Sequence, residues 1–171
     1  KNQLYVCKQL EKFKQRNPEI KLSYKNFGKI KDKKYASLIE MHDFVELCPA
    51  KPHEELIDEY RKADVFVMLS KTESFGIVYG EAISQALPIL YTKGEGFDNQ
   101  FEDGFVGYAV DLSKKDDFVQ RLECILNDYE GFSGRAIRGA HKFDWDKIAR
   151  QYSDIYAEII HANGKSYEIK A

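Results

Sequence analysis

At 171 residues, with 43% hydrophobic and 32% charged side chains, the chain has the length and composition of one globular domain with a sizeable core. The formal net charge of −2 and the lack of a basic-aromatic motif argue against nucleic-acid binding, and no apolar stretch is long enough to cross a bilayer. The first residues also lack the pattern of a secretory leader, so we expect a cytoplasmic protein.

Hydrophobic periodicity predicts that helices and strands alternate along the chain. In the first half we expect helices near 4–13, 35–39 and 52–60, and strands near 20–24, 44–47 and 63–69. Asn17 and Pro18 would close the first helix, and Pro52 suits the first turn of the third. In the second half we expect helices near 77–86, 118–125 and 137, short strands near 89–91 and 108–110, and one last long helix.

This alternation predicts an α/β fold, with a Rossmann-like parallel sheet covered by helices on both faces, in a single domain of residues 1–171. The stripe positions of Tyr60 and Tyr152 assign both tyrosines to the core. The last helix places five apolar residues on one stripe, with charged residues opposite: Trp145, Ile148, Tyr152, Ile155 and Ile159.

Cysteine and histidine are used sparingly. Cys7, Cys48 and Cys124 are far apart and form no Cys-x-x-Cys pair, which is typical of a reducing compartment and predicts buried thiols. The four histidines are scattered, without cysteines at ligand spacing, so we expect no zinc or other protein-built metal site. Gly94 and Gly96 follow a strand, but their spacing is not that of a dinucleotide fingerprint, and we interpret this segment as a flexible loop near the ligand.

Residues 73–81, reading Glu-Ser-Phe-Gly-Ile-Val-Tyr-Gly-Glu, are the most informative stretch. They follow the buried strand at 63–69 and open a helix that must end before Leu87 and Pro88. In an open parallel sheet, ligands collect beyond the carboxyl ends of the strands, where a helix N-terminus offers unpaired N–H groups and about +0.5 charge. A phosphate group is therefore the natural ligand here.

The two acids of this stretch suit different tasks. Glu73 lies in the loop, where its carboxylate can accept hydrogen bonds from a polyhydroxylated group, whereas Glu81 lies about one and a half turns into the helix and can take two vicinal hydroxyls, as on a ribose. Gly76 would let a diphosphate approach the backbone. Most glutamates on helices are simply solvated, however, so this spacing alone is a weak signal.

Landmarks along most of the chain resemble the C-terminal domain of the family 4 (group 1) retaining glycosyltransferases. Besides residues 69–88, they occur in the same order as in that family: Glu54-Glu55-Leu56, Ala63-Asp64-Val65-Phe66-Val67, Glu102-Asp103-Gly104 and Phe143-Asp144-Trp145-Asp146-Lys147-Ile148-Ala149. The resemblance implies a GT-B architecture, in which two Rossmann-like domains face each other across a cleft. This chain would be the C-terminal, nucleotide-sugar-binding half.

The same resemblance implies a reaction and a set of contacts. The enzyme would transfer a glycosyl group from a nucleotide-diphosphate sugar to an acceptor hydroxyl with retention, as in surface polysaccharide or glycoconjugate synthesis. Glu73 would contact the donor sugar and Glu81 the ribose. The diphosphate would lie on the backbone of the residues between them: Ser74, Phe75, Gly76, Ile77 and Val78. We expect no cofactor, because the nucleotide sugar is a substrate, and no metal.

Two departures from the family pattern bear on the donor. Lys1 matches a diphosphate-neutralising lysine, but the strand and arginine that precede it in the family are absent, so we expect a fragment of a longer enzyme. Pro49 replaces a glycine near the base, which leaves the nucleotide open, and Lys51 is the candidate base contact.

Other partners and functions stay open. A sugar or lipid-linked acceptor would be bound by the missing N-terminal domain. The ten lysines among the first 34 residues fit either solvated helix edges or peripheral contact of the full-length enzyme with an anionic membrane. The alternatives are a GT-B nucleotide-sugar epimerase, which would turn over without an acceptor, and a noncatalytic nucleotide-binding module.

Overall fold

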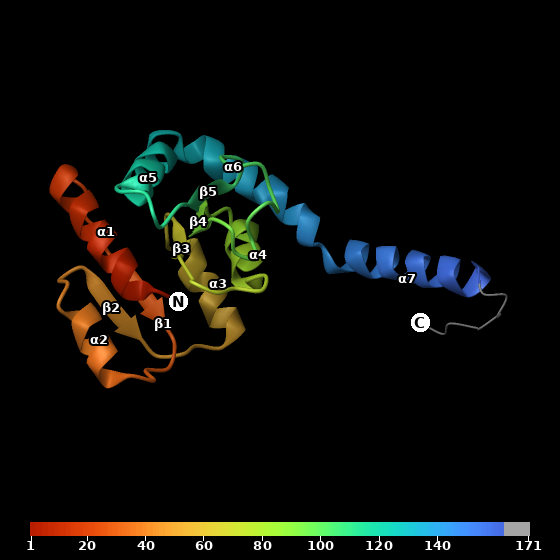
Figure 1. The fold of residues 1–171 in the computed structure, drawn as a ribbon, viewed down its shortest axis with the longest axis horizontal. Coiled ribbons are helices and arrows are strands. Elements are labelled where there is room, and N and C mark those ends of the chain that lie inside the picture. Colours follow the sequence, from red (N-terminus) through yellow and green to blue (C-terminus); the bar gives the residue numbers. More distant parts are fainter. Residues whose placement is uncertain (163–171) are drawn as a thin grey trace.

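The computed structural model describes residues 1–162, in which seven α-helices, one short 3-10 helix and five strands alternate (Figure 1). The helices of the first half are α1 (Gln3–Arg16), α2 (Lys33–Glu40) and α3 (His53–Arg61). Those of the second half are α4 (Ile77–Ser84), α5 (Asp117–Asn127), α6 (Tyr129–Ala140), the 3-10 helix His141–Phe143 and α7 (Trp145–Ala162).

The strands are all parallel and form two sheets. β1 (Tyr24–Phe27) pairs with β2 (Val45–Cys48), and β4 (Ile89–Thr92) lies between β3 (Phe66–Met68) and β5 (Gly107–Val110). Among the described residues no ladder joins β1 to β3, so each of these two is an edge strand. The predicted parallel α/β fold is confirmed, with its strands divided between two sheets.

Helices cover both faces of the larger sheet because its strands bury side chains in both directions. On β4, Leu90 points into one apolar cluster while Ile89 and Tyr91 point into another. The first cluster is completed mainly by α1 and α5, and the second mainly by α4. Tyr60 packs against the second cluster, as predicted.

Two elements differ in length from the prediction. The first strand begins only at Tyr24, because the chain turns before it, with the Ile20 N–H donating to the Asn17 carbonyl at 3.1 Å. The helix expected near Ile137 extends over the twelve residues of α6.

Most of the apolar stripe on α7 is exposed, and so is Tyr152, so the assignment of Tyr152 to the core is wrong. Trp145 is 73% and Tyr152 56% exposed, because α7 extends away from the rest of the domain (Figure 1).

The prediction that all three cysteine thiols are buried is wrong for Cys124. Cys7 and Cys48 are buried, but Cys124 is exposed, because α5 turns Phe118, Leu122 and Ile125 toward the core and leaves position 124 outside.

Candidate functional site

The loop between β3 and α4 ends in a backbone conformation that requires glycine. Gly76, the residue before α4, has φ +76° and ψ 70°, which is left-handed. A Cβ at this position would lie 2.6 Å from the ring of Tyr79, whose hydroxyl donates to the Met68 carbonyl at 2.5 Å. Tyr79 therefore ties the start of α4 to the end of β3, and Gly76 makes room for its ring.

Glu73 lies in this loop and meets Lys1, which is 72 residues away in the sequence. The Lys1 ammonium donates a hydrogen bond to the Glu73 carboxylate, and this contact is the main reason why the pKa of Glu73 lies below its ordinary value. The Glu73 side chain is only 13% exposed, whereas that of Lys1 is half exposed. Lys1 and Glu73, which the sequence analysis expected to contact the same nucleotide sugar, thus lie in direct contact with each other.

A second loop, after β4, holds the backbone of Glu73 on both sides. The Glu95 carboxylate accepts a hydrogen bond from the Glu73 N–H at 2.7 Å, and the Gly96 N–H donates to the Glu73 carbonyl at 2.9 Å. The Thr92 hydroxyl adds a bond to the Ser70 carbonyl at 2.8 Å. Sequence reasoning missed Glu95, although Gly94 and Gly96 on either side of it were interpreted as a flexible loop near the ligand.

Glu81 lies on α4 and faces α3. Its carboxylate accepts a hydrogen bond from the Tyr60 hydroxyl at 3.2 Å and lies 3.6 Å from Nδ1 of His53. Burial, followed by the Glu81 charge, raises the pKa of Tyr60, so this hydroxyl keeps its proton and remains a donor. Glu81 is 22% exposed, and its partners differ from those of Glu73.

The residues between the two acids present the first turn of α4. Ser74, Phe75 and Ile77 are exposed, with Ile77 61% exposed, and Val78 is half-buried. The Phe75 ring packs edge-on against Phe143 with 5.7 Å between centroids. The Tyr79 N–H donates to the Gly76 carbonyl at 3.0 Å. Because the first amides of a helix have no acceptor within it, the N–H groups of Ile77 and Val78 are the ones that this turn offers to a ligand.

Lys51 follows β2 and is already paired. Its ammonium donates to the Glu59 carboxylate at 2.9 Å and lies 5.5 Å from the centre of the Phe27 ring. Lys25 and Lys62 also approach Glu59, at 3.6 and 3.3 Å. With the Lys51 hydrogen bond as the largest cause, the pKa of Glu59 falls to about 2. Lys51 thus lies beyond the carboxyl ends of β1 and β2, beside an aromatic face.

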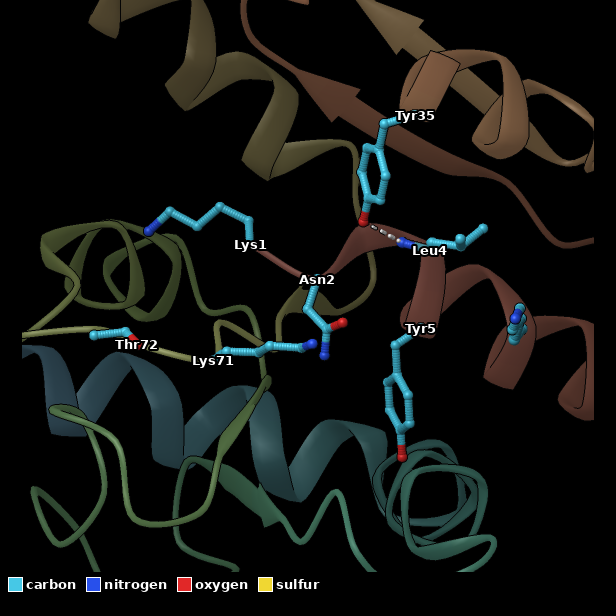
Figure 2. Close-up of a pocket in the computed structure, with 8 residues that line it drawn as sticks. Lys1, Asn2, Leu4, Tyr5, Tyr35, Lys71 and Thr72 are labelled. Atoms are coloured by element: carbon cyan, nitrogen blue, oxygen red, sulfur yellow. Dashed lines mark hydrogen bonds between the residues drawn. The ribbon is translucent and has the colours of Figure 1, made fainter. Parts of the chain in front are cut away.

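An open pocket of about 650 Å³ lies beside the first residues of the chain (Figure 2). It is bounded by the start of α1, by Tyr35 of α2 and by the loop after β3. The Tyr35 hydroxyl accepts a hydrogen bond from the Leu4 N–H at 3.0 Å, which fixes α1 against α2 at one side of the pocket. Lys1 is the residue that this pocket shares with the Glu73 site.

Residues 1–162 contain neither a cluster of metal ligands nor a membrane-spanning helix. No three histidine, cysteine or carboxylate side chains gather there in a way that could hold a metal ion. No helix in that range combines the length and apolarity needed to span a membrane.

Comparison with known sequences gives a family and a set of relatives. The profile of the glycosyl transferases group 1 family matches residues 1–142. The D-inositol 3-phosphate glycosyltransferase of Streptomyces bingchenggensis is 32% identical over 130 residues, which is 74% of this chain and 29% of that protein. The protein of the same name from an Arthrobacter species is 36% identical over 143 residues, 78% of this chain and 34% of its own. The chain thus spans about a third of the length of these relatives.

Solved structures agree in fold. A glycosyltransferase from Rickettsia africae superposes with a TM-score of 0.75 at 16% identity, over 90% of this chain and 43% of that one. The pneumococcal O-GlcNAc transferase GtfA, solved with UDP and GlcNAc, gives 0.72 at 20% identity, over 93% and 33%. Anabaena Alr3699/HepE, solved with UDP-glucose, gives 0.67 at 16% identity, over 80% and 41%. The chain belongs to the group 1 glycosyltransferase family and has the fold of the C-terminal domain of a GT-B glycosyltransferase.

Proposed function

We propose that this chain is the donor-binding domain of a longer, retaining glycosyltransferase, which transfers a glycosyl group from a nucleotide-diphosphate sugar to an acceptor hydroxyl. Family membership supports the transferase class over an epimerase, and the structures solved with UDP or UDP-glucose support the donor class. The observation that carries the proposal is the meeting of the Lys1 ammonium, the Glu73 carboxylate and the start of α4 beyond the carboxyl end of β3.

Each group at this site has a proposed contact. The diphosphate lies on the first-turn amides of α4, near Gly76, with the Lys1 ammonium beside it. Glu81 binds the ribose hydroxyls with the carboxylate oxygen that Tyr60 does not hold. Glu73 accepts hydrogen bonds from the hydroxyls of the donor sugar. Lys51 borders the base, which can rest near the Phe27 ring.

The chemistry of the step follows from these charges. The bond from the anomeric carbon to the diphosphate breaks through an oxocarbenium-like transition state, and negative charge grows on the leaving oxygen. Lys1 and the α4 amides stabilise that charge from fixed positions. Lys1 lies between two anions, because it keeps its contact with Glu73 and gains one with the diphosphate once the donor binds. The carboxylate of Glu73 then faces the positive charge of the sugar ring.

The remaining parts of the proposal concern the whole enzyme. A second, N-terminal domain orients the acceptor hydroxyl and supplies any general base. We assign the reaction to a metal-independent hexosyl transfer in surface polysaccharide or glycoconjugate synthesis, at the cytoplasmic face of a membrane to which the enzyme attaches peripherally. These assignments follow the family resemblance, because the pocket for the acceptor lies outside this domain.

The direct test is the affinity of the full-length enzyme for its donor. A thermal-shift screen against UDP-, GDP- and ADP-sugars names the nucleotide, since a ligand of the native state raises its melting temperature. Glu81→Ala should then weaken binding by about 1.5 to 3 kcal/mol, or roughly 10- to 150-fold, the range for hydrogen bonds to a charged group. Tyr60→Phe, which keeps the carboxylate and removes only its internal donor, is the matched control and should bind within about threefold of wild type. An unchanged Kd for Glu81→Ala would remove Glu81 from the site.

A further inference from the structure

Four lysines without an acidic partner follow one another where β1 passes into α2. All four are exposed, and none forms an ion pair in the part of the chain that the structure describes: Lys29, Lys31, Lys33 and Lys34. The one acid among them, Asp32, accepts a hydrogen bond from the Tyr35 N–H at 3.1 Å and caps α2. Four lysines against one aspartate give residues 29–34 a formal charge of +3. Even fully extended, this segment spans only about 18 Å, so the charges are necessarily close together.

Helix stability does not explain these charges. A helix N-terminus carries about +0.5 charge and favours acids, yet α2 begins with Lys33 and Lys34 and has no acid in its first turn. Helix α3, by contrast, has Glu54 and Glu55 in its first turn. The lysines therefore repel one another and the helix dipole, and only an anion from outside the described chain would offset this repulsion.

Large aliphatic side chains are exposed among the lysines. Ile30, in the middle of the loop, is 57% exposed. On α2, Leu38 is 47% and Met41 79% exposed, and they share a face with Lys34 because they follow it by four and seven residues. The buried side chains of α2 lie on another face. Ammonium groups and apolar groups are thus offered to the same partner.

The shape of this surface favours a flat partner. Residues 28–34 are all exposed, so no other part of the described chain covers them. Figure 1 shows α2 at the outer edge of the domain, remote from α4 and α7. No concave site is needed, because lysine binds phosphate as a point charge without a fixed geometry. Residues 28–34 also contain no aromatic ring on which a base could stack, which disfavours single-stranded nucleic acid.

We propose that residues 28–34 and the exposed face of α2 dock on a membrane that contains anionic lipids. The lysines bind lipid phosphates, and Ile30 enters the boundary between head groups and acyl chains, so the surface combines the two signals that stable attachment requires. This inference rests on the proposed peripheral attachment of the enzyme, and it depends on none of the donor contacts.

The experiment measures co-sedimentation of the full-length protein with vesicles of phosphatidylcholine, alone or with about 30% phosphatidylglycerol, in about 0.1 M and about 0.5 M NaCl. Lys29→Ala with Lys31→Ala is compared with Lys114→Ala with Lys115→Ala. The control lysines precede α5, are exposed, form no ion pair within residues 1–162 and carry the same charge.

A second comparison tests the apolar contact. Ile30→Ser is set against Ile137→Ser, which removes an isoleucine of α6 that is 45% exposed. Calorimetry with UDP, carried out on every variant, separates membrane binding from donor binding.

We expect wild type to bind the anionic vesicles in about 0.1 M NaCl, and to lose most of this binding in about 0.5 M NaCl or without phosphatidylglycerol. A lysine near an anionic leaflet is worth about fivefold in binding, so the loop pair should weaken it about 25-fold. Ile30→Ser should weaken it at least about fivefold. Both control variants should stay within about threefold of wild type, and all variants should keep wild-type affinity for UDP.

Three results would each overturn the proposal. Wild type that ignores anionic vesicles would mean that another part of the enzyme or a protein partner covers the loop. An equal loss in the two lysine pairs would mean that net charge alone attracts the protein. Binding that Ile30→Ser leaves unchanged would mean that no side chain enters the bilayer. If vesicles bind as expected while no nucleotide or nucleotide sugar does, the membrane surface stands and the donor assignment fails.

Discussion

Gly96 is the position where a single methyl group should disturb the donor site most directly. A Cβ on Gly96 would lie 1.9 Å from the Ser74 carbonyl oxygen and 2.6 Å from that of Glu73, both backbone atoms that no rotamer change can move. To reach 3.0 Å, the shortest separation that Cβ atoms normally show, the two loops must part by about 1.1 Å. Gly96→Ala should therefore displace the loop that bears Glu73.

The magnitude follows from the contacts that this displacement breaks. The bond from Gly96 N–H to the Glu73 carbonyl, 2.9 Å long, and that from Glu73 N–H to the Glu95 carboxylate, 2.7 Å long, join the two loops at this point. The backbone bond is worth about 0.5 to 1.5 kcal/mol and the bond to the Glu95 carboxylate about 1.5 to 3 kcal/mol, which gives a loss of about 2 to 4.5 kcal/mol in unfolding free energy. For a domain of this size, that corresponds to a Tm lower by about 4 to 18 °C.

The assay pairs thermal unfolding with donor binding. Gly96→Ala should lose affinity for a nucleotide sugar while keeping affinity for the free nucleotide, because Glu73 is the proposed sugar contact. Gly94→Ala is the control: its Cβ would meet nothing within 4 Å, but its φ of +81° makes alanine strained by about 1 to 2 kcal/mol, so it lowers stability without moving Glu73. A Gly96→Ala protein with wild-type Tm and sugar-nucleotide affinity would refute the reasoning.

Three further predictions concern stability and reactivity. Hydrogen bonds from Lys51 and, to a lesser extent, Lys62 lower the pKa of Glu59 from 4.5 to about 2, so this carboxylate stabilises the fold above pH 4.5 and loses its contribution as the pH falls toward 2. Glu59→Gln should accordingly reduce the decline of Tm over that range, and parallel Tm curves for both proteins would contradict it. Cys124 should react with iodoacetamide in the native protein, while Cys7, whose buried thiol has a pKa raised to about 11, should react only after unfolding; mass spectrometry reads both. Gly134→Ala, at a helical position where the nearest neighbour of the new Cβ is 3.5 Å away, should raise the unfolding free energy by about 0.5 to 1 kcal/mol in urea titration.

The site could be predicted from the sequence wherever the signal was local. A half-buried strand, a left-handed glycine and the start of α4 follow one another within residues 66–77, so periodicity and Gly76 predicted the strand, loop and helix on which the candidate site is built. The contact of Lys1 with Glu73 was within reach only through the family resemblance. Glu95 was out of reach, because its bond to Glu73 joins two loops that are 22 residues apart and depends on how they pack.

The two wrong assignments, Tyr152 and Cys124, have a common cause. Periodicity identifies which face of a helix is apolar, but it does not say what covers that face. The apolar stripe on α7 exists but is mostly exposed, so amphipathicity alone placed Tyr152 wrongly in the core. On α5, Cys124 adjoins the buried Ile125, yet one residue is a rotation of about 100° around the helix, enough to turn the thiol outward.

The division of the strands between two sheets has a consequence for how this polypeptide associates. β1 and β3 each have one side without a ladder in the described part of the chain, although Tyr24 of β1 and Val67 of β3 pack against the same apolar cluster. Such backbone edges accept any extended peptide that approaches in register. As an isolated domain, residues 1–171 should therefore associate with extended, strand-forming segments of other chains. A parallel segment that pairs with both edges would join the two sheets into a single continuous one.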